Sequence, residues 1–113
     1  MAYSAVQLAT ALGARAIVTP SVSGRTARQV SRLRPPMPII AVVPTESVAR
    51  RLALTWGVQP VIADLSGNTD EVMVAARDAA LHAGLVNHAD LVVLTAGVPV
   101  GLPTRLTSVL EVP

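Results

Sequence analysis

The stretch "PIIAVVPTESVARRLALTWGVQPVIA" at residues 38–63 holds two short apolar runs with a different pattern between them. The runs at 38–43 and 58–63 are rich in Val and Ile and are bounded by Pro, Gly or polar residues, which is typical of buried strands. The apolar residues between them recur at the spacing of one helix face, and they are Val48, Leu52 and Trp56. The stretch therefore predicts a strand, a helix and a second strand in succession.

The same alternation extends to both sides of this unit. Residues 15–18 and 90–95 are two further β-branched runs. Three more segments carry apolar stripes at helical spacing, formed by Ala5, Leu8, Ala9 and Leu12, by Ala27, Val30 and Leu33, and by Val72, Ala76, Ala79 and Ala83. Residues that cap helix starts are Thr45 and either Asn68 or Thr69, and glycines that end helices are Gly13, Gly57 and Gly84.

Strands that alternate with helices require a mainly parallel sheet with helices on both faces, so the expected fold class is three-layer α/β/α. The last segment, 106–112, follows the fourth expected strand after only the connection 96–105. This connection is too short for a crossover helix, so the segment should return antiparallel as an edge strand. An exposed edge strand invites pairing with a second chain.

Composition excludes several classes of protein. With 113 residues the chain is expected to form one domain, and 51% hydrophobic against 14% charged residues excludes a disordered segment. No apolar run approaches the roughly 20 residues that span a membrane. Residues 1–18 show no secretory signal pattern, so we expect a soluble, cytoplasmic protein without a membrane partner. The chain has no cysteine, which removes disulfides and zinc-thiolate sites.

Nucleic acid is not an expected partner. All nine basic residues are arginine, yet the net charge is only +2, which is too small for a nucleic-acid footprint. Aromatic side chains that stack on bases are also scarce, with one Trp, one Tyr and no Phe.

The stretch "TPSVSGRTAR" at residues 19–28 joins the first expected strand to the second expected helix. Ligands of open α/β sheets bind beyond the carboxyl ends of the strands, where this loop should lie. Ser23 is the expected N-cap, and the backbone N–H groups after it would offer donors to an oxyanion. The residues expected to hold a phosphate group are Thr19, Ser21, Ser23, Gly24, Arg25 and Thr26, with Arg28 as a second cation. Taken alone, the stretch is explained equally well by a helix cap with a polar loop.

A second candidate loop at 95–105 reads "TAGVPVGLPTR" and follows the fourth expected strand. Gly97 and Gly101 would let it close over a ligand, and Arg105 would supply a second contact for an anion. The alternative is a Gly/Pro-rich connector, which is preferred unless the first loop lies beside it.

Other catalytic and metal-binding patterns are missing. No G-x-G-x-x-G follows a strand and the chain contains no lysine, which excludes a Walker-type phosphate loop. His82 and His88 are not spaced to share a helix face, so we assign no metal site. Ser23 has no G-x-S-x-G setting and no recognisable base, which makes a stand-alone phosphatase or transferase the least favoured hypothesis.

Three blocks of sequence together resemble one family. In chain order, "TPSVSGRTARQVSRLRP", "PIIAVVPTESVARRLALTWGVQPV" and "HADLVVLTAGVPVG" are similar to the C-terminal domain of pyruvate kinase, a glycolytic enzyme. The resemblance covers nearly the whole chain. It implies a five-stranded mixed sheet of order 3-2-1-4-5 with the last strand antiparallel, in agreement with the pattern above.

The resemblance also implies a regulatory function. In that family this domain binds phosphorylated effectors, either sugar phosphates or nucleoside monophosphates, and the loop that matches Thr19 to Thr26 holds the phosphate. The family's last strands pair across a two-fold axis of the tetramer. A self-association interface is therefore expected at Leu106, Ser108, Leu110 and Val112.

Catalysis is not expected from this chain alone. The resemblance implies that phosphoryl transfer from phosphoenolpyruvate to ADP takes place on a barrel domain with a lysine, magnesium-binding acids and a potassium site, none of which these 113 lysine-free residues contain. No cofactor is therefore expected here. We expect residues 1–113 to be a single domain without barrel and lid domains, either part of a longer enzyme or a stand-alone relative, and the abrupt start "MAYSAVQ" favours the first.

One departure from the family concerns the effector site. Many members have a Gly-Ser-Thr-Asn pattern before the last strand, where this chain has "TRLT" at 104–107. Either Arg105 supplies what backbone donors supply elsewhere, or the site has lost its ligand. Two hypotheses remain: a phosphate-binding regulatory domain, and an oligomerisation module whose hydroxyl-rich loop only caps a helix.

Overall fold

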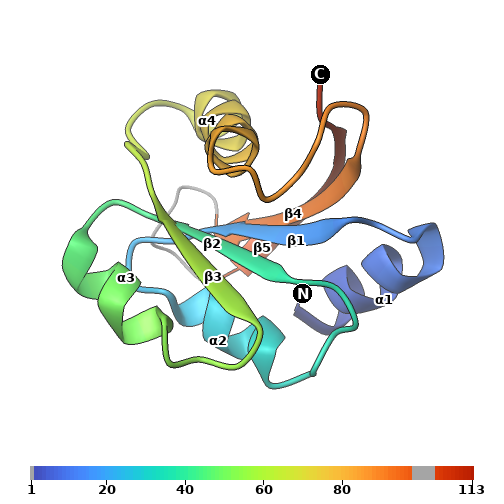
Figure 1. The fold of residues 1–113 in the computed structure, drawn as a ribbon, viewed down its shortest axis with the longest axis horizontal. Helices are drawn as coiled ribbons and strands as arrows, with labels where there is room; N and C mark the ends of the chain where they lie inside the picture. The colour runs from blue at the N-terminus through green and yellow to red at the C-terminus, as the bar shows by residue number, and fades with distance from the viewer. Residues whose placement is uncertain (1, 98–103) are drawn as a thin grey trace.

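The computed structural model describes residues 2–97 and 104–113 of the chain (Figure 1). The helices are α1 (Ala2–Leu12), α2 (Arg25–Ser31), α3 (Glu46–Leu52) and α4 (Thr69–His82). The strands are β1 (Ala16–Pro20), β2 (Ile39–Val43), β3 (Val58–Ile62), β4 (Leu91–Gly97) and β5 (Thr104–Glu111). Within the described ranges, no helix is long and apolar enough to cross a membrane.

The strands form one sheet of order β3-β2-β1-β4-β5. The first four strands run parallel, and β5 runs antiparallel to β4. The predicted α/β class, strand order and antiparallel last strand are therefore confirmed. The last two strands are longer than predicted, because β4 continues to Gly97 and β5 already begins at Thr104, with an irregular register at Ala96 and Gly97.

Helices α1, α2 and α3 lie on one face of the sheet, here called the three-helix face, and α4 lies on the other, the α4 face (Figure 1). Ile17 and Val93 belong to the core cluster of the three-helix face, and Val18 and Leu94 belong to that of the α4 face. Successive strand residues point to opposite faces, so the central strands are buried on both sides. Strands of this kind are continuously apolar, which is why the sequence shows runs instead of alternation.

The helix starts follow the predicted caps with one exception. Thr45 Oγ1 accepts a hydrogen bond from Val48 N at 3.4 Å, and Asn68 forms a capping box with Glu71 at the start of α4. The prediction that Ser23 caps α2 is wrong, because the cap position is Gly24, which has no side chain to accept a bond. The chain enters α2 through the left-handed conformation of Gly24, one residue later than the hydroxyl pattern indicates.

Sequence periodicity places some helical stripes inaccurately. Helix α3 ends at Leu52, so Trp56 lies in the following turn and is 46% exposed. Leu33 likewise lies beyond α2 and is exposed. In α4 the third buried residue is Ala80 and not Ala79. Steps of three and of four residues both stay on one helix face, so the pattern alone does not choose between these two alanines.

Candidate functional site

Buried hydroxyl groups gather where β1 and β4 end. The buried polar side chains in the part of the chain that the structure describes are Thr19, Ser21, Thr26, Ser31 and Thr95. Only Ser31 lies elsewhere, and its Oγ donates to Trp56 O at 2.6 Å. The other four lie near the end of β1 or β4, in the loop after β1, or in the first turn of α2. Burial of a hydroxyl is costly unless it is bonded, so this concentration marks the candidate site.

The two serines of the loop bond to its own backbone. Ser21 Oγ accepts a hydrogen bond from Gly24 N at 2.9 Å in a buried position. Ser23 Oγ accepts one from Arg25 N at 3.4 Å, which is longer and weaker and lies at the surface. We expected these backbone donors to be open to an anion. The structure instead fills both with serine oxygens, which an incoming oxyanion could replace.

Gly24 has a packing role that the sequence did not reveal. Its φ is 81°, and a Cβ placed on it would lie 2.9 Å from Leu52 Cδ1 of α3. We expected its missing side chain to let a ligand approach the backbone. In the structure the missing side chain makes room for Leu52.

Thr19 is the most unusual residue of the cluster. It is fully buried. Its Oγ1 is a buried polar atom that has no hydrogen-bond partner among the described residues. An unsatisfied buried hydroxyl costs about 1–3 kcal/mol. Native proteins rarely keep such a group, and an absent ligand or water is one physical explanation.

The charges around the loop favour an anion. Residues 19–34 contain four arginines and no Asp or Glu, which gives this segment a formal charge of +4. Arg25 and Arg28 are exposed on α2. Arg34 is engaged elsewhere, because its guanidinium lies 4.6 Å from the centre of the Trp56 ring. This segment therefore offers exposed arginines beside the loop and contains no carboxylate of its own that would repel a phosphate.

The second predicted loop is described only at its two ends. Gly97 is the last residue of β4 and Arg105 lies in β5, while Gly101 lies outside the described residues. Because β4 pairs with β1, with Leu94 beside Val18, the end of β4 lies next to the hydroxyl cluster. The structure therefore brings the start of the second loop close to the first.

The predicted interface residues of β5 divide between the strand's surface and the core. Val112 is fully buried and Leu110 packs partly buried against the core of the α4 face. Ser108 is partly exposed, and Leu106 pairs with Ala96. Val109, which was not predicted, is 40% exposed. The side chain of Val112 therefore stabilises this chain's own core and offers no surface to a partner.

The backbone of β5 presents a free edge. Val112 N donates to Asp90 O at 2.8 Å, and Val112 O accepts from Ala89 N at 2.7 Å, so the backbone of Val112 faces the β4 side. The direction of backbone bonding alternates along an antiparallel strand. Ser108 and Leu110 therefore bond to β4, while the N–H and C=O groups of Val109 and its alternate neighbours point away from the sheet.

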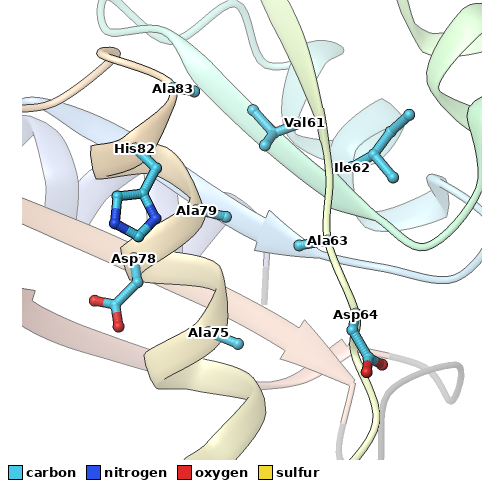
Figure 2. A pocket seen from close by; sticks show the side chains of 9 residues that line it. All are labelled: Val61, Ile62, Ala63, Asp64, Ala75, Asp78, Ala79, His82 and Ala83. Carbon is cyan, nitrogen blue, oxygen red and sulfur yellow. The ribbon is translucent and has the colours of Figure 1, made fainter.

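A groove between α4 and β3, which the sequence analysis did not identify, is shown in Figure 2. It has a volume of about 550 Å³ and is lined by Val61, Ile62, Ala63, Asp64, Ala75, Asp78, Ala79, His82 and Ala83. Ala75 and Ala79 point from α4 toward β3, whereas Ile62 points away from α4 (Figure 2). Short alanine side chains leave this space open, and a sequence pattern cannot distinguish them from core alanines.

One carboxylate of this groove, that of Asp64, is bonded to the backbone that follows it. Asp64 Oδ1 accepts a hydrogen bond from Ser66 N at 2.9 Å, and backbone and side-chain hydrogen bonds from Ser66 hold the pKa of Asp64 below its ordinary value. A carboxylate with a lowered pKa is a poor proton donor near neutral pH. Across residues 2–97 and 104–113, no group of three His, Cys, Asp or Glu side chains is placed to hold a metal ion.

The architecture is that of an open α/β domain whose candidate ligand site lies at the carboxyl ends of its parallel strands. The family model described as "Pyruvate kinase, alpha/beta domain" matches residues 1–112. The chain belongs to this family, and the resemblance seen in its three sequence blocks is confirmed.

Individual relatives agree with this assignment. The chain is 51% identical over 109 residues to the pyruvate kinase of Geobacillus stearothermophilus and 50% identical over 101 residues to that of Clostridium acetobutylicum. These alignments cover 96% and 89% of this chain but 18% and 21% of the relatives, so the chain spans about a fifth of their length. A crystal structure of a pyruvate kinase from Cryptosporidium parvum matches 99% of this chain and 22% of its own, with a TM-score of 0.84 and 29% identity.

Proposed function

We propose that this chain is a regulatory domain of a pyruvate kinase and that the loop at 19–26 binds the phosphate group of an effector. The observation that carries the proposal is the buried hydroxyl cluster with the unpartnered Thr19 Oγ1. Membership of the family supports the same conclusion. The expected effectors are sugar phosphates or nucleoside monophosphates, in which a phosphate is joined to a polar ring.

Phosphate binding would exchange hydrogen bonds within the loop. Gly24 N and Arg25 N, which now donate to serine oxygens, would donate to the phosphate instead. The hydroxyls of Ser21 and Ser23 would then turn and donate to the same anion. The exposed guanidinium of Arg25 would neutralise charge through a charge-assisted bond. The rest of the effector would extend toward the loop after β4, where Arg105 is the second proposed cation.

The last strand is the proposed route to regulation. Its free backbone edge would pair with the same strand of a second copy across a two-fold axis. An effector that binds better to one arrangement of the assembled subunits shifts the population toward it. Phosphoryl transfer, with its magnesium and potassium, would belong to a catalytic part of a longer protein that these 113 residues do not include.

An oligomerisation module without an effector is the second candidate. The bond from Gly24 N to Ser21 Oγ favours it, because the loop is already partly satisfied without a ligand. In this case β5 would still pair with a second copy, and the serines would only shape the entry into α2.

Calorimetric titration of the chain distinguishes the two candidates. The probes are ribose 5-phosphate, fructose 1,6-bisphosphate, adenosine monophosphate and inorganic phosphate. We expect saturable binding of at least one probe, and Arg25→Ala should weaken it about tenfold through the loss of a charge-assisted hydrogen bond. Arg32→Ala is the matched control, since Arg32 is an exposed arginine at the other end of α2 and should change affinity less than about twofold. No heat with any probe would reject the effector site.

A further inference from the structure

Three threonines lie side by side on three neighbouring strands of the sheet, β1, β4 and β5, at the level of the phosphate loop. Thr95 of β4 pairs directly with Thr107 of β5. Thr19 of β1 lies next to Thr95, because the preceding residues Val18 and Leu94 are register partners in the parallel pair. The three residues form a row that runs from the loop to the edge strand, here called the threonine row.

The threonine row points to the three-helix face. Ile17 and Val93 lie two residues before Thr19 and Thr95 and belong to the core cluster of that face. Side chains two residues apart in a strand share a face. The row therefore lies on the side of the sheet that α2 covers (Figure 1).

The hydroxyls of the row are bonded at one end and open at the other. Thr107 Oγ1 donates to Thr95 Oγ1 at 3.3 Å, while Thr19 Oγ1 has no partner among the described residues. Thr19 and Thr95 are both fully buried. The usual distance for a bond between hydroxyls is about 2.7–2.8 Å, so the bond between Thr107 and Thr95 is weak and can become stronger.

We propose that Thr95 is a positioning residue that links occupancy of the phosphate loop to the edge strand. The inference rests on the proposed phosphate site and adds a route for its regulation. An oxyanion that accepts a hydrogen bond from Thr19 Oγ1, directly or through one ordered water, makes the Thr19 oxygen a better acceptor. Thr95 then donates to Thr19, and Thr107 donates to Thr95. In such a chain every hydroxyl points toward the anion and each bond strengthens the next.

The consequence for β5 is a firmer attachment to β4. The row holds the edge strand through the side chain of Thr107, in addition to the backbone ladder, whose register is irregular between Ala96 and Gly97. A strand that is already ordered loses less conformational entropy when it pairs with a second chain. Anion binding at the loop therefore favours association at the free edge without direct contact between the two sites.

Amide hydrogen exchange of the 113-residue chain, with inorganic phosphate as the probe, tests this inference. Phosphate should slow the exchange of the Ser108 and Leu110 amides, which bond to β4, by about twofold or more. Thr95→Val keeps the shape of the side chain and removes the hydroxyl. Thr95 is not among the groups of the 19–26 loop that are proposed to contact the phosphate, so this variant should still bind phosphate within about threefold of the wild-type affinity. Its β5 amides should no longer respond.

Thr95→Ser is the rescue variant, because it restores a hydroxyl at the same position and should restore the response. Ser31→Ala removes a buried hydroxyl at the far end of α2 and should leave the response intact. Thr95→Val and Ser31→Ala each remove one buried hydroxyl, so a general loss of stability would affect both of them. A response that is lost only in Thr95→Val therefore cannot be explained by lower stability.

The possible outcomes separate the inference from the proposed function. Phosphate that binds the wild-type chain without slowing exchange in β5 would overturn the link and leave the phosphate site standing. Full protection in Thr95→Val would show that the threonine row is not the route. A wild-type chain that does not bind phosphate would overturn both the site and the link.

Discussion

The two edges of the sheet differ along a single row of residues on the three-helix face. From Thr19 toward β3, the row continues through Ala41 and ends at Pro60. From Thr19 toward β5, it continues through Thr95 and ends at Thr107. One half of the row has no side chain that can form a hydrogen bond, and the other half has a hydroxyl on every strand. A chain of side-chain hydrogen bonds along this row can therefore extend from Thr19 toward β5 but not toward β3.

The backbones of the two edges differ in the same sense. Ile39 N donates to Gly57 O, so by alternation Val58, Pro60 and Ile62 direct their backbone groups away from β2. Val58 N already donates to Thr55 O at 3.2 Å, and Pro60 has no N–H. Only the N–H of Ile62 is left as an outward donor on β3. Proline on an edge strand is a known protection against unwanted pairing.

No such protection is present on the described part of β5. Its sequence at residues 107–111 contains no proline. Val109 directs its N–H group away from the sheet, and its side chain on the three-helix face is partly exposed. The difference implies that β3 is closed to strand addition and β5 is open. Three substitutions test this comparison.

The largest effect is expected from Val109→Pro. The substitution removes an outward N–H group and leaves the bonds of Ser108 and Leu110 to β4 intact. A two-fold pairing of β5 strands loses this donor in both copies, at about 0.5–1.5 kcal/mol each. We expect dimerisation to weaken by about tenfold or more, as measured by sedimentation equilibrium.

Val109→Thr is the control for this substitution, because it retains the N–H group and a β-branched shape at position 109. It should dimerise like the wild-type chain. Circular dichroism of both variants verifies that the fold is retained. A wild-type chain that remains monomeric at high concentration would contradict the view of β5 as an open edge.

A smaller effect in the opposite direction is expected from Pro60→Val. The new N–H group would lie beside that of Ile62, whose side chain is 53% exposed, and the two would offer adjacent donors on β3. We expect association at this edge to become up to about tenfold tighter, which light scattering would detect as species larger than dimers. Combining Pro60→Val with Val109→Pro isolates the β3 edge. A double variant that stays monomeric would show that Pro60 is not what protects β3.

The fold could be predicted from the sequence because its determinants are local. Continuous Val and Ile runs marked the central strands, and the short connection after β4 required β5 to be antiparallel. Side chains at Thr45 and Asn68 marked two helix starts. The start of α2 was missed by one residue, because Ser21, Ser23 and Gly24 are all acceptable near a helix start and only the observed conformation of Gly24 decides between them.

The candidate site was predictable only where its residues are neighbours in the sequence. The hydroxyl-rich loop stands out as one stretch, and the structure gathers Thr19, Ser21 and Thr26 as buried groups. Thr95 was included only as the first residue of the second candidate loop and was not singled out, because a threonine at the end of an apolar run is typical of an ordinary β-branched strand residue. Its relation to Thr19 depends on the register between β1 and β4, which the sequence does not encode at any single position.

The smallest effect is expected from Thr19→Val, at the residue where the two halves of the row meet. If Thr19 Oγ1 is kept unsatisfied for a ligand, a side chain of the same shape without the hydroxyl should stabilise the free chain. We expect the free energy of unfolding to rise by about 1 kcal/mol in urea titrations, because the desolvation cost of the hydroxyl is removed. The affinity for phosphate should fall in the same variant.

Thr107→Val is the matched substitution at the other end of the threonine row. Its effect on the free energy of unfolding should have the opposite sign. The hydroxyl of Thr107 donates to Thr95, so its removal deprives a buried oxygen of its partner and should lower the free energy of unfolding. A stabilising Thr19→Val beside a destabilising Thr107→Val means that the row is complete at the β5 edge and open at the loop. If Thr19→Val is also destabilising, its hydroxyl has a partner in the free protein, such as a buried water, and is not held in reserve for an anion.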